Sequence, residues 1–350
     1  MWTGFTQMTE DRKTLRLCAA SEEDVERAAE ILRDGGTVAF PTETVYGLGA
    51  SALDTRAVAA IFASKHRPTW DPLIVHVSDR EMLGRLVVLE GDLRDRARRL
   101  VEAFWPGPLT LLLPRTGAVP DAVTAGRERV GVRMPGHPVA LDLIRRAGVP
   151  VAAPSANRFG RTSPTTAAHV LEDLDGRIDA VLDGGPTAVG VESTVLDVCE
   201  WPMVIYRPGA ITEAMIAEVG GEARVFETDR TEAAPTSLPS PGVGLRHYAP
   251  RARLVLVREI AEDPRSSLEV AIRILREVRA GVMLPAGWDC SGAGLVYNWG
   301  PWEDRETLAR RLFDGLRTLD EAGAEAIVCP LPRAGGLGDA LRDRLEKAAR

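Results

Sequence analysis

Lysine is nearly absent from this chain, although positive charge is not. Lysine and arginine together number 43 among 350 residues, yet the lysines are only Lys13, Lys65 and Lys347. Two of them lie near the ends of the sequence, so Lys65 stands alone in its interior. A compact ammonium and a planar guanidinium do different work in proteins. The isolated Lys65 therefore indicates a position that requires an ammonium, within the segment KHRP at residues 65–68.

Closely spaced cysteines and long apolar runs are also absent. The four cysteines lie far apart and form no CxxC pair, which argues against a zinc site or a disulfide framework. No apolar run reaches the roughly 18 residues expected of a membrane span. The first residues lack the charged and apolar regions of a signal peptide. We therefore expect a soluble, cytoplasmic protein.

Positive charge is concentrated in one region of an acidic chain. The net charge of −7 argues against a protein that coats nucleic acid without specificity. Residues 127–161 nevertheless contain seven arginines against Glu128 and Asp142, a local balance of +5. This segment indicates either a patch for an anionic ligand or a solvated arginine face.

The pattern of apolar residues predicts an α/β protein with two domains, which suits 350 residues with 45% apolar content. Residues 1–221 alternate strand-like runs with amphipathic helices. Residues 222–252 form a polar linker whose end is aromatic, so we expect that end to dock on another part of the molecule. Residues 253–350 show a second α/β pattern and predict a small three-layer domain with a parallel sheet.

Local signals place several helices and strands. Either Asp54 or Thr55 caps a predicted helix that ends at Lys65, and residues 138–147 predict a helix that ends at Gly148. Ser163 followed by Pro164 predicts a further helix start, with the serine as its cap. The segments 37–40, 73–77, 109–113, 130–133 and 149–153 read as strands, and the stretch from Pro41 to Ser51 reads as rich in turns.

Candidate side chains for chemistry follow these strands. Lys65 and Arg67 lie two residues apart before a proline-bounded loop and suit two oxygens of a polyphosphate. His76 lies in an apolar strand, where a lone histidine is more often structural than a ligand. Arg133 is a charge on another apolar strand, so its partner is either a bound carboxylate or phosphate or an internal acid. Asp71 either serves this site or holds the turn before a proline.

The segment PSAN at residues 154–157 places the hydroxyl of Ser155 and the amide of Asn157 at the end of an apolar run. Ser163, as a predicted helix cap, offers an N-terminus that can hold an anion. Together with KHRP, these residues predict a site that handles phosphate. The linker end around Tyr248 is the segment expected to dock nearby.

These motifs together resemble the two-domain form of the threonylcarbamoyl-AMP synthase family, which joins a YrdC-like domain with a twisted mixed sheet to a smaller Rossmann-like domain. The matching segments run in family order over roughly the first 250 residues, and the end of the chain, GLGDALRDRLEKAA, also resembles the family. They are PTETVYGLG (41–49), KHRP with DPLIVH (65–76), WPGPLT (105–110), VGVRMP (130–135), PSANRFGRTSPT (154–165), GVESTV (190–195), YRPG (206–209) and SPGVGLRHYAP (240–250).

The resemblance implies that L-threonine, bicarbonate and ATP react to give threonylcarbamoyl-AMP and pyrophosphate, with Mg²⁺ held by the ATP phosphates rather than by assigned protein ligands. The product then serves a tRNA threonylcarbamoyl transferase complex. The resemblance implies three sets of site residues. They are Lys65, Arg67, Ser155 and Asn157 for catalysis; Thr44, His76, Arg133, Ala153 and Ser193 for threonine; and Arg67, Asp71, Arg129, Ser155, Ser163, Arg207 and Tyr248 for ATP.

Two residues depart from the family pattern. Asp71 stands where asparagine is more common, and Arg129 stands where a small residue is common. If position 129 binds through its backbone, the change of side chain costs little. The alternatives to adenylate synthesis are an RNA-binding module that uses the arginines of residues 127–161, and carbamoyl transfer from another donor. The second is weak, because the chain lacks the extra zinc-binding and acylphosphatase modules of the larger enzymes that carry this domain.

Overall fold

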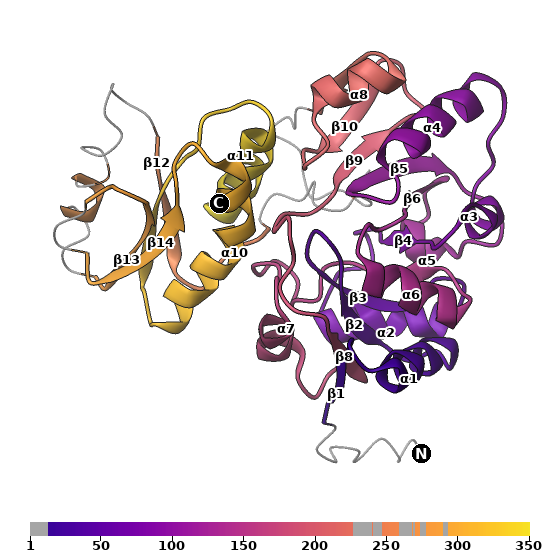
Figure 1. Cartoon of the computed structure of the whole chain (residues 1–350), viewed down its shortest axis with the longest axis horizontal. Helices are drawn as coiled ribbons and strands as arrows, with labels where there is room; N and C mark the ends of the chain where they lie inside the picture. Colours follow the sequence, from indigo (N-terminus) through magenta and orange to yellow (C-terminus); the bar gives the residue numbers. More distant parts are fainter. Residues whose placement is uncertain are drawn as a thin grey trace, which may run out of the picture.

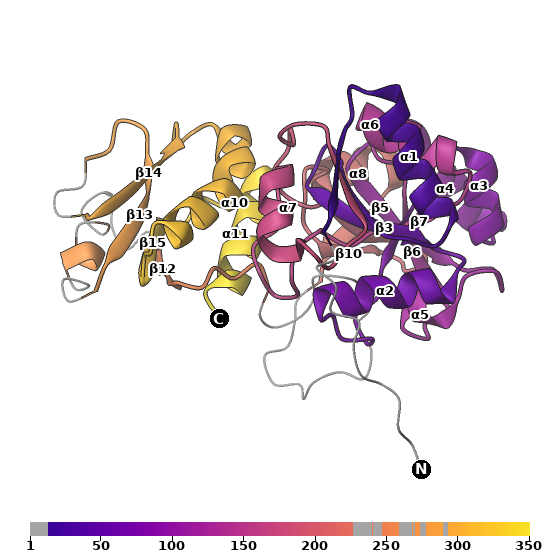
Figure 2. The same cartoon turned by 90° about the horizontal axis from the view of Figure 1, so that it is seen from below.

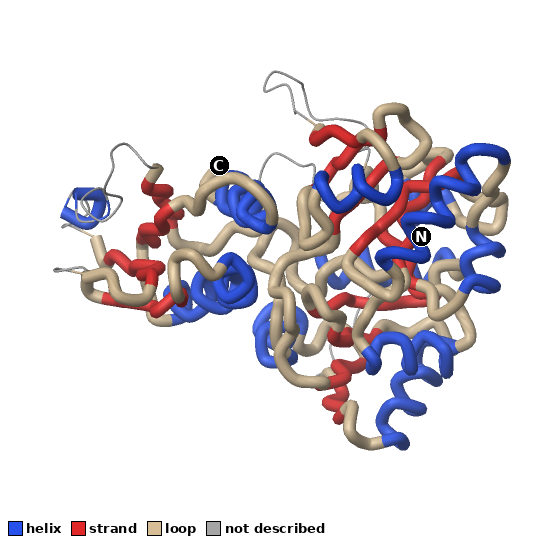
Figure 3. The backbone as a smooth tube through the Cα atoms, turned by 45° about the horizontal axis from the view of Figure 1, so that its top comes forward, coloured by secondary structure: helices blue, strands red, loops and turns tan. Residues whose placement is uncertain are grey.

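The computed structural model describes residues 13–226, 240, 247–258, 268, 270–273, 278–289 and 293–350. Within these residues the chain forms two sheets, each with its own helices (Figure 1). Figure 3 shows the strands of the larger domain running through its centre, with helices outside them. The fold is therefore α/β, as the sequence predicts, with a large mixed sheet and a second, smaller domain.

The larger sheet has eleven strands among the described residues, in the order β1-β8-β2-β3-β7-β4-β6-β5-β9-β10-β11. The sheet is mixed, since β4 pairs with β6 in parallel while β5 pairs with β6 in antiparallel fashion. The strands are β1 (Leu15–Cys18), β2 (Val38–Pro41), β3 (Tyr46–Ser51), β4 (Ile74–His76), β5 (Leu109–Pro114), β6 (Arg129–Arg133), β7 (Val151–Ala152), β8 (Ala180–Asp183), β9 (Thr194–Asp197), β10 (Met203–Arg207) and β11 (Ala223–Val225).

The helices of this domain begin and end where local chemistry favours it. The side chain of Asp54 accepts from two backbone N–H groups at the start of α2, and His66 ends that helix in the left-handed region with φ 52°. Gly148 ends α6 in the same way with φ 68°. The helices are α1 (Glu22–Arg33), α2 (Thr55–Lys65), α3 (Arg80–Leu86), α4 (Gly91–Phe104), α5 (Asp121–Thr124), α6 (Pro138–Ala147), α7 (Ala167–Leu174) and α8 (Glu213–Gly220).

The structure corrects two expectations in this domain. No helix begins at Ser163: α7 begins at Ala167, and Thr166 is its cap, with a side chain that accepts from the N–H of His169. The stretch before Ser51, expected to be turn-rich, contains the buried strand β3. In both places a tertiary contact overrides the local signal, because the N–H of Tyr46, at the start of β3, donates to the carbonyl of Pro164.

The second domain has a four-stranded sheet in the order β12-β15-β13-β14, and every pair in it is parallel. This confirms the expected small domain with a parallel sheet. The sequence pattern also predicts a helix at residues 267–280, of which residues 267, 269 and 274–277 lie outside the described residues. The elements are β12 (Arg253–Val257), β13 (Ala280–Pro285), β14 (Leu295–Gly300), α10 (Arg305–Glu321), β15 (Ala326–Pro330) and α11 (Leu337–Ala348).

Helices α10 and α11 join the small domain to the large one, since they lie between its sheet and the larger domain (Figures 1 and 2). At Gly190 the backbones come so close that an added Cβ would lie 2.3 Å from the Cα of Arg310 on α10. The guanidinium of Arg317 donates to the carbonyl of Thr162 and pairs with Asp173 at 2.7 Å. The two domains are therefore closely packed, and an ion pair connects them.

The predicted linker 222–252 lies largely outside the described residues. Its first part differs from expectation, because β11 pairs with β10 and so extends the larger sheet beyond residue 221. The described part at its other end, residues 247–250, lies against the larger domain, where the N–H of Ala249 donates to the carbonyl of Gly160. The boundaries at 221 and 252 stay predictions. None of the described helices has the length and apolar content needed to cross a bilayer.

Candidate functional site

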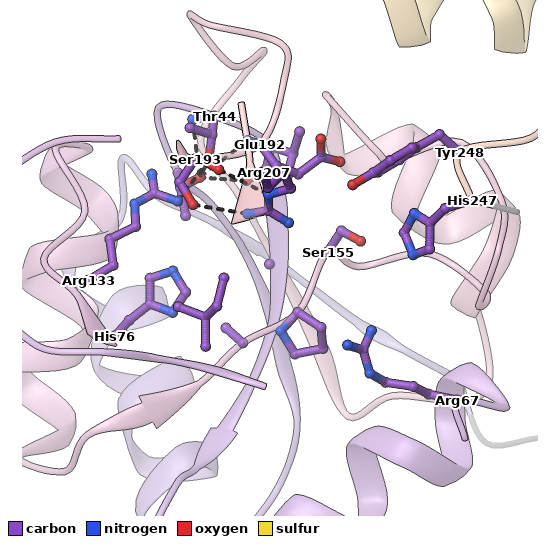
Figure 4. A pocket seen from close by; sticks show the side chains of 16 residues that line it. Thr44, Arg67, His76, Arg133, Ser155, Glu192, Ser193, Arg207, His247 and Tyr248 are labelled. Atoms are coloured by element: carbon purple, nitrogen blue, oxygen red, sulfur yellow. Dashed lines mark hydrogen bonds between the residues drawn. The ribbon is translucent and has the colours of Figure 1, made fainter. Parts of the chain in front are cut away.

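A pocket in the larger domain brings together most of the residues that the sequence singles out (Figure 4). In this view Arg133 and His76 lie at one side, Arg67 and Tyr248 at the other, and the remaining side chains between them. The predicted site residues that line the pocket are Thr44, Arg67, His76, Arg133, Ala153, Ser155, Ser193, Arg207 and Tyr248.

Arg133 dominates the first side of the pocket. It is 4% exposed, at the end of β6, and its guanidinium donates to the hydroxyl of Thr44 at 3.0 Å and to the carbonyl of Gly107 at 3.1 Å. The third partner is the carboxylate of Glu43, 2.7 Å away. The sequence leaves open whether Arg133 pairs with a bound anion or with an internal acid. The structure identifies Glu43 as an internal acid that pairs with it. Burial raises the pKa of Glu43, but Arg133 outweighs this effect and lowers it overall.

His76 lies directly beside Arg133, because β4 and β6 pair in register at these two residues. Burial, followed by the charge of Arg133, lowers the pKa of His76 to about 3. At neutral pH the imidazole is therefore uncharged. Its Nδ1 has no hydrogen-bond partner among the described residues, and the side chain lines the pocket. A neutral imidazole with a free nitrogen suits a hydroxyl or amine ligand.

Ser193 and Arg207 form the wall between the two sides. The guanidinium of Arg207 donates to the carbonyl and to the hydroxyl of Ser193, both at 3.0 Å. The same hydroxyl lies 2.8 Å from that of Thr110. These bonds fix the orientation of Arg207, which is 5% exposed, so its charge is held at the pocket without a mobile side chain.

Arg67 on the opposite side is held by the loop that follows it. Its guanidinium donates to the carbonyl of Pro72 at 2.8 Å and pairs with Asp71 at 3.0 Å. Asp71 is 1% exposed and is not among the residues that line the pocket. Burial raises the pKa of Asp71, although Arg67 acts in the opposite direction. Asp71 thus contacts the pocket through Arg67 rather than directly.

The structure gives Lys65 a role that the sequence does not indicate. Its ammonium donates to the backbone carbonyl of Ser155 at 2.5 Å and to that of Asn157, and it is 1% exposed. Burial, followed by the charge of Arg67, lowers the pKa of Lys65 well below its usual value. Lys65 is not among the lining residues, so the ammonium holds the PSAN loop from behind.

Within that loop the hydroxyl of Ser155 donates to the side-chain oxygen of Asn157 at 2.5 Å. The amide nitrogen of Asn157 donates to the carbonyls of Arg158 and Arg161, at 2.9 and 2.8 Å. Asn157 is therefore bound inside the loop, and only Ser155 of the pair lines the pocket. Three residues of the predicted catalytic set are therefore connected, because Lys65 and Asn157 support Ser155.

Two more of the predicted ATP residues, Arg129 and Ser163, do not line the pocket, as Asp71 does not. The side chain of Arg129, at the start of β6, pairs with Asp197 and with Glu200, the latter at 2.8 Å. Arg129 is not a lining residue. The hydroxyl of Ser163 donates to the carboxylate of Glu192 and caps no helix.

Sequence reasoning missed Glu192 and His247, which both line the pocket. Glu192 is 5% exposed, and its carboxylate pairs with Arg344 of α11 at 2.7 Å. A carboxylate between two apolar residues and two hydroxyl residues in GVESTV was an available signal for Glu192. Its partner, 152 residues away in the second domain, left no local signal.

Tyr248 closes the pocket on the side of Arg67. Its backbone has φ 64°, a conformation that residues other than glycine seldom adopt. Its ring stacks on Phe313 of α10, with centroids 5.9 Å apart, and the guanidinium of Arg344 lies 5.2 Å from it. Tyr248 is 1% exposed. Its strained backbone is thus held in place by side chains of the second domain.

Two family models together cover nearly the whole chain. The family described as telomere recombination matches residues 30–209, and the C-terminal domain of threonylcarbamoyl-AMP synthase matches residues 211–350. A threonylcarbamoyl-AMP synthase from Pyrococcus abyssi is 43% identical over 92% of this chain and 93% of its own length. The chain belongs to the threonylcarbamoyl-AMP synthase family.

Further relatives agree with this assignment. The threonylcarbamoyl-AMP synthase of Bacillus subtilis is 41% identical over 99% of this chain and 96% of its own length. The crystal structure of P. abyssi Sua5 complexed with L-threonine superposes with a TM-score of 0.88 at 41% identity, covering 96% of this chain and 97% of that one. Membership in this family makes the chain an enzyme that forms an adenylate, in a reaction of the nucleotidyl transfer type.

Proposed function

We propose that the pocket holds L-threonine at the Arg133 side and ATP at the side of Arg67 and Tyr248. The observation that carries this proposal is the distribution of charge and hydrogen-bonding groups along one pocket. Arg133 with Thr44 suits an amino acid carboxylate, and neutral His76 suits a hydroxyl or amine. The relative crystallised with L-threonine supports a threonine site in this fold.

ATP occupies the other side in this proposal. Arg67 and Arg207 supply two fixed positive charges, and Ser155 supplies a hydroxyl that lies between them in Figure 4. Guanidinium groups bind phosphate oxygens with good geometry and keep their charge at neutral pH. Tyr248, with His247 beside it at a ring distance of 4.1 Å, covers the pocket and restricts the entry of water.

The reaction proposed for this pocket joins bicarbonate to the threonine amine, with loss of water, to form a carbamate. A carbamate oxygen then attacks the α-phosphate of ATP, a new P–O bond forms, and the bond to pyrophosphate breaks. Negative charge grows on the phosphoryl oxygens as this happens. The guanidinium groups of Arg67 and Arg207 stabilise that charge. Because Arg133 holds the carboxylate, the amine end of threonine is the end left free to react.

Mg²⁺ arrives with ATP in this proposal. In the part of the chain that the structure describes, no group of three histidine, cysteine, aspartate or glutamate side chains is arranged to hold a metal ion. In this proposal the phosphates of ATP provide the ligands for Mg²⁺. The product passes to a tRNA threonylcarbamoyl transferase complex, and we place the enzyme in the cytoplasm.

A pyrophosphate-release assay tests the proposal. The full chain is incubated with ATP, Mg²⁺ and bicarbonate, and threonine is compared with serine at equal concentration. We expect release that saturates with threonine and is weaker with serine, since Val45 and Ile74 line the pocket and suit the extra methyl group. Release that is independent of threonine, or no release, would contradict the proposal.

A further inference from the structure

A buried ion pair connects the second domain to the pocket. Arg344 of α11 is fully buried at 0% exposure, although arginine seldom is. Its Nε lies 2.7 Å from the carboxylate of Glu192, and its terminal nitrogen donates to the backbone carbonyl of Glu192 at 3.3 Å. One arginine of the small domain thus holds both the side chain and the backbone of a residue that lines the pocket in the large domain.

Glu192 keeps a negative charge at neutral pH. Burial raises the pKa of this carboxyl, but the nearby charges of Arg344 and Arg207 outweigh burial and lower it overall. A carboxylate in the wall of a pocket repels a polyphosphate, and the repulsion is strong where little water screens it. A pocket that binds ATP therefore needs a cation to offset Glu192.

Arg207 is already oriented by its two bonds to Ser193, and its charge is available to a ligand. Arg344 does not line the pocket but lies next to its wall, where it pairs with Glu192 on one side. On its other side it meets Asp343 at 2.6 Å, but Asp343 also pairs with Lys347 at 2.7 Å. Two cations thus face two carboxylates, and the charge of the group is balanced only while Arg344 is present.

We propose that Arg344 is the counter-ion of Glu192 and that the small domain, through this residue, forms part of the ATP site. Arg344 is a positioning residue, since it acts through Glu192 and through the ring of Tyr248 rather than on ATP. The proposal rests on the proposed function in one respect, the assignment of ATP to this side of the pocket. It gives the second domain a purpose in adenylate synthesis.

The test measures the dissociation constants of Mg-ATP and of threonine by titration calorimetry, together with the KM for ATP. In the full chain, Arg344→Met leaves the charge of Glu192 uncompensated. We expect the dissociation constant and KM for ATP to rise about tenfold, as for the loss of one close charge partner. The dissociation constant of threonine should stay within about twofold, because Arg133 and Thr44 lie at the other side.

Two further variants separate charge from packing. Arg342→Met on the same helix is the matched control, since the side chain of Arg342 donates to the carbonyl of Pro332 in its own domain, and we expect no change in ATP affinity. Adding Glu192→Gln to Arg344→Met removes both charges, and ATP affinity should recover to within about threefold of the wild type. A loss of packing alone would not be reversed in this way.

An unchanged ATP dissociation constant in folded Arg344→Met overturns the proposal, as does an equal loss of ATP and threonine affinity. If Arg344→Met does not fold, the ATP affinity of the single variant Glu192→Gln tests the proposal instead. ATP affinity at or above that of the wild type supports the counter-ion, and weaker affinity overturns it. A wild type that binds ATP but releases no threonine-dependent pyrophosphate refutes the proposed reaction, and the affinities of the variants still decide the role of Arg344.

Discussion

The two sides of the pocket differ in the number of domains that contribute to them. The proposed threonine side, with Arg133, Thr44 and His76, belongs entirely to the large domain, and its central arginine is fixed by three partners from that domain. The proposed ATP side combines Arg67 from the loop after α2 with Tyr248, which packs on the small domain. The threonine side is therefore formed within one domain, whereas the ATP side depends on the contact between two.

The largest effect should come from Arg133→Ala. We expect threonine affinity to fall by about a hundredfold or more, since a buried charged partner is removed and Glu43 is left unpaired. Threonine-dependent pyrophosphate release should fall below detection while the fold survives. Titration of threonine and of Mg-ATP checks this, with Arg133→Lys as the control that keeps the charge. A loss of ATP affinity equal to that of threonine affinity would erase the distinction between the two sides.

Lys65→Met should act on the ATP side instead. Two backbone carbonyls of the PSAN loop lose their donor, so we expect the free energy of unfolding to fall by about 1–3 kcal/mol. Ser155 should lose its fixed place, and pyrophosphate release should fall strongly. Urea unfolding and the release assay measure the two effects, and threonine affinity serves as the internal control. Full activity in folded Lys65→Met would remove this residue from the account.

His76 should make the threonine side sensitive to acid. Its pKa falls from 6.5 to about 3 on folding, so between these values the unfolded chain binds more protons than the folded one. The stability that neutral His76 contributes is present above pH 6.5 and is lost as the pH falls toward 3. Between pH 6.5 and 5 this amounts to about 2 kcal/mol. Urea unfolding at both pH values should show a smaller loss in His76→Asn than in the wild type, and an equal loss would refute the assignment.

The smallest effect should come from Arg129→Thr, which replaces an uncommon arginine with the small residue typical of the family. Its side chain pairs with Asp197 and Glu200 outside the pocket. We expect KM values within about twofold of the wild type and a change in the free energy of unfolding of at most about 1 kcal/mol. A marked rise in the KM for ATP would place Arg129 in the ATP site after all.

Much of the fold could be predicted from the sequence where local signals act alone. Helix α6 has the predicted bounds, because a proline at its first turn and Gly148 after its last suffice to define it. Ser163 with Pro164 carried the same kind of signal, yet α7 begins three residues later at Thr166 and Ala167. There the hydroxyl is taken by Glu192 and the proline carbonyl by Tyr46, and neither contact is visible in the local sequence.

The candidate site could also be predicted only in part. Residue types indicated which side chains handle charge, and Arg133, Arg67 and Ser155 do line one pocket. Residue types did not indicate where each side chain points. The ammonium of Lys65 faces backbone carbonyls, and Arg344 reaches the pocket wall from the other domain. Contacts over such sequence distances are fixed by tertiary packing, which a single sequence does not display.

The central claim is that Arg133 holds the threonine carboxylate, so that the amine end, as a carbamate, attacks ATP. Mass spectrometry of a reaction with ¹³C-bicarbonate, threonine and Mg-ATP tests it most directly. The account predicts an adenylate that contains threonine and carries the ¹³C label. A threonyl adenylate without the label would show that the carboxylate attacks instead, and it would contradict the account.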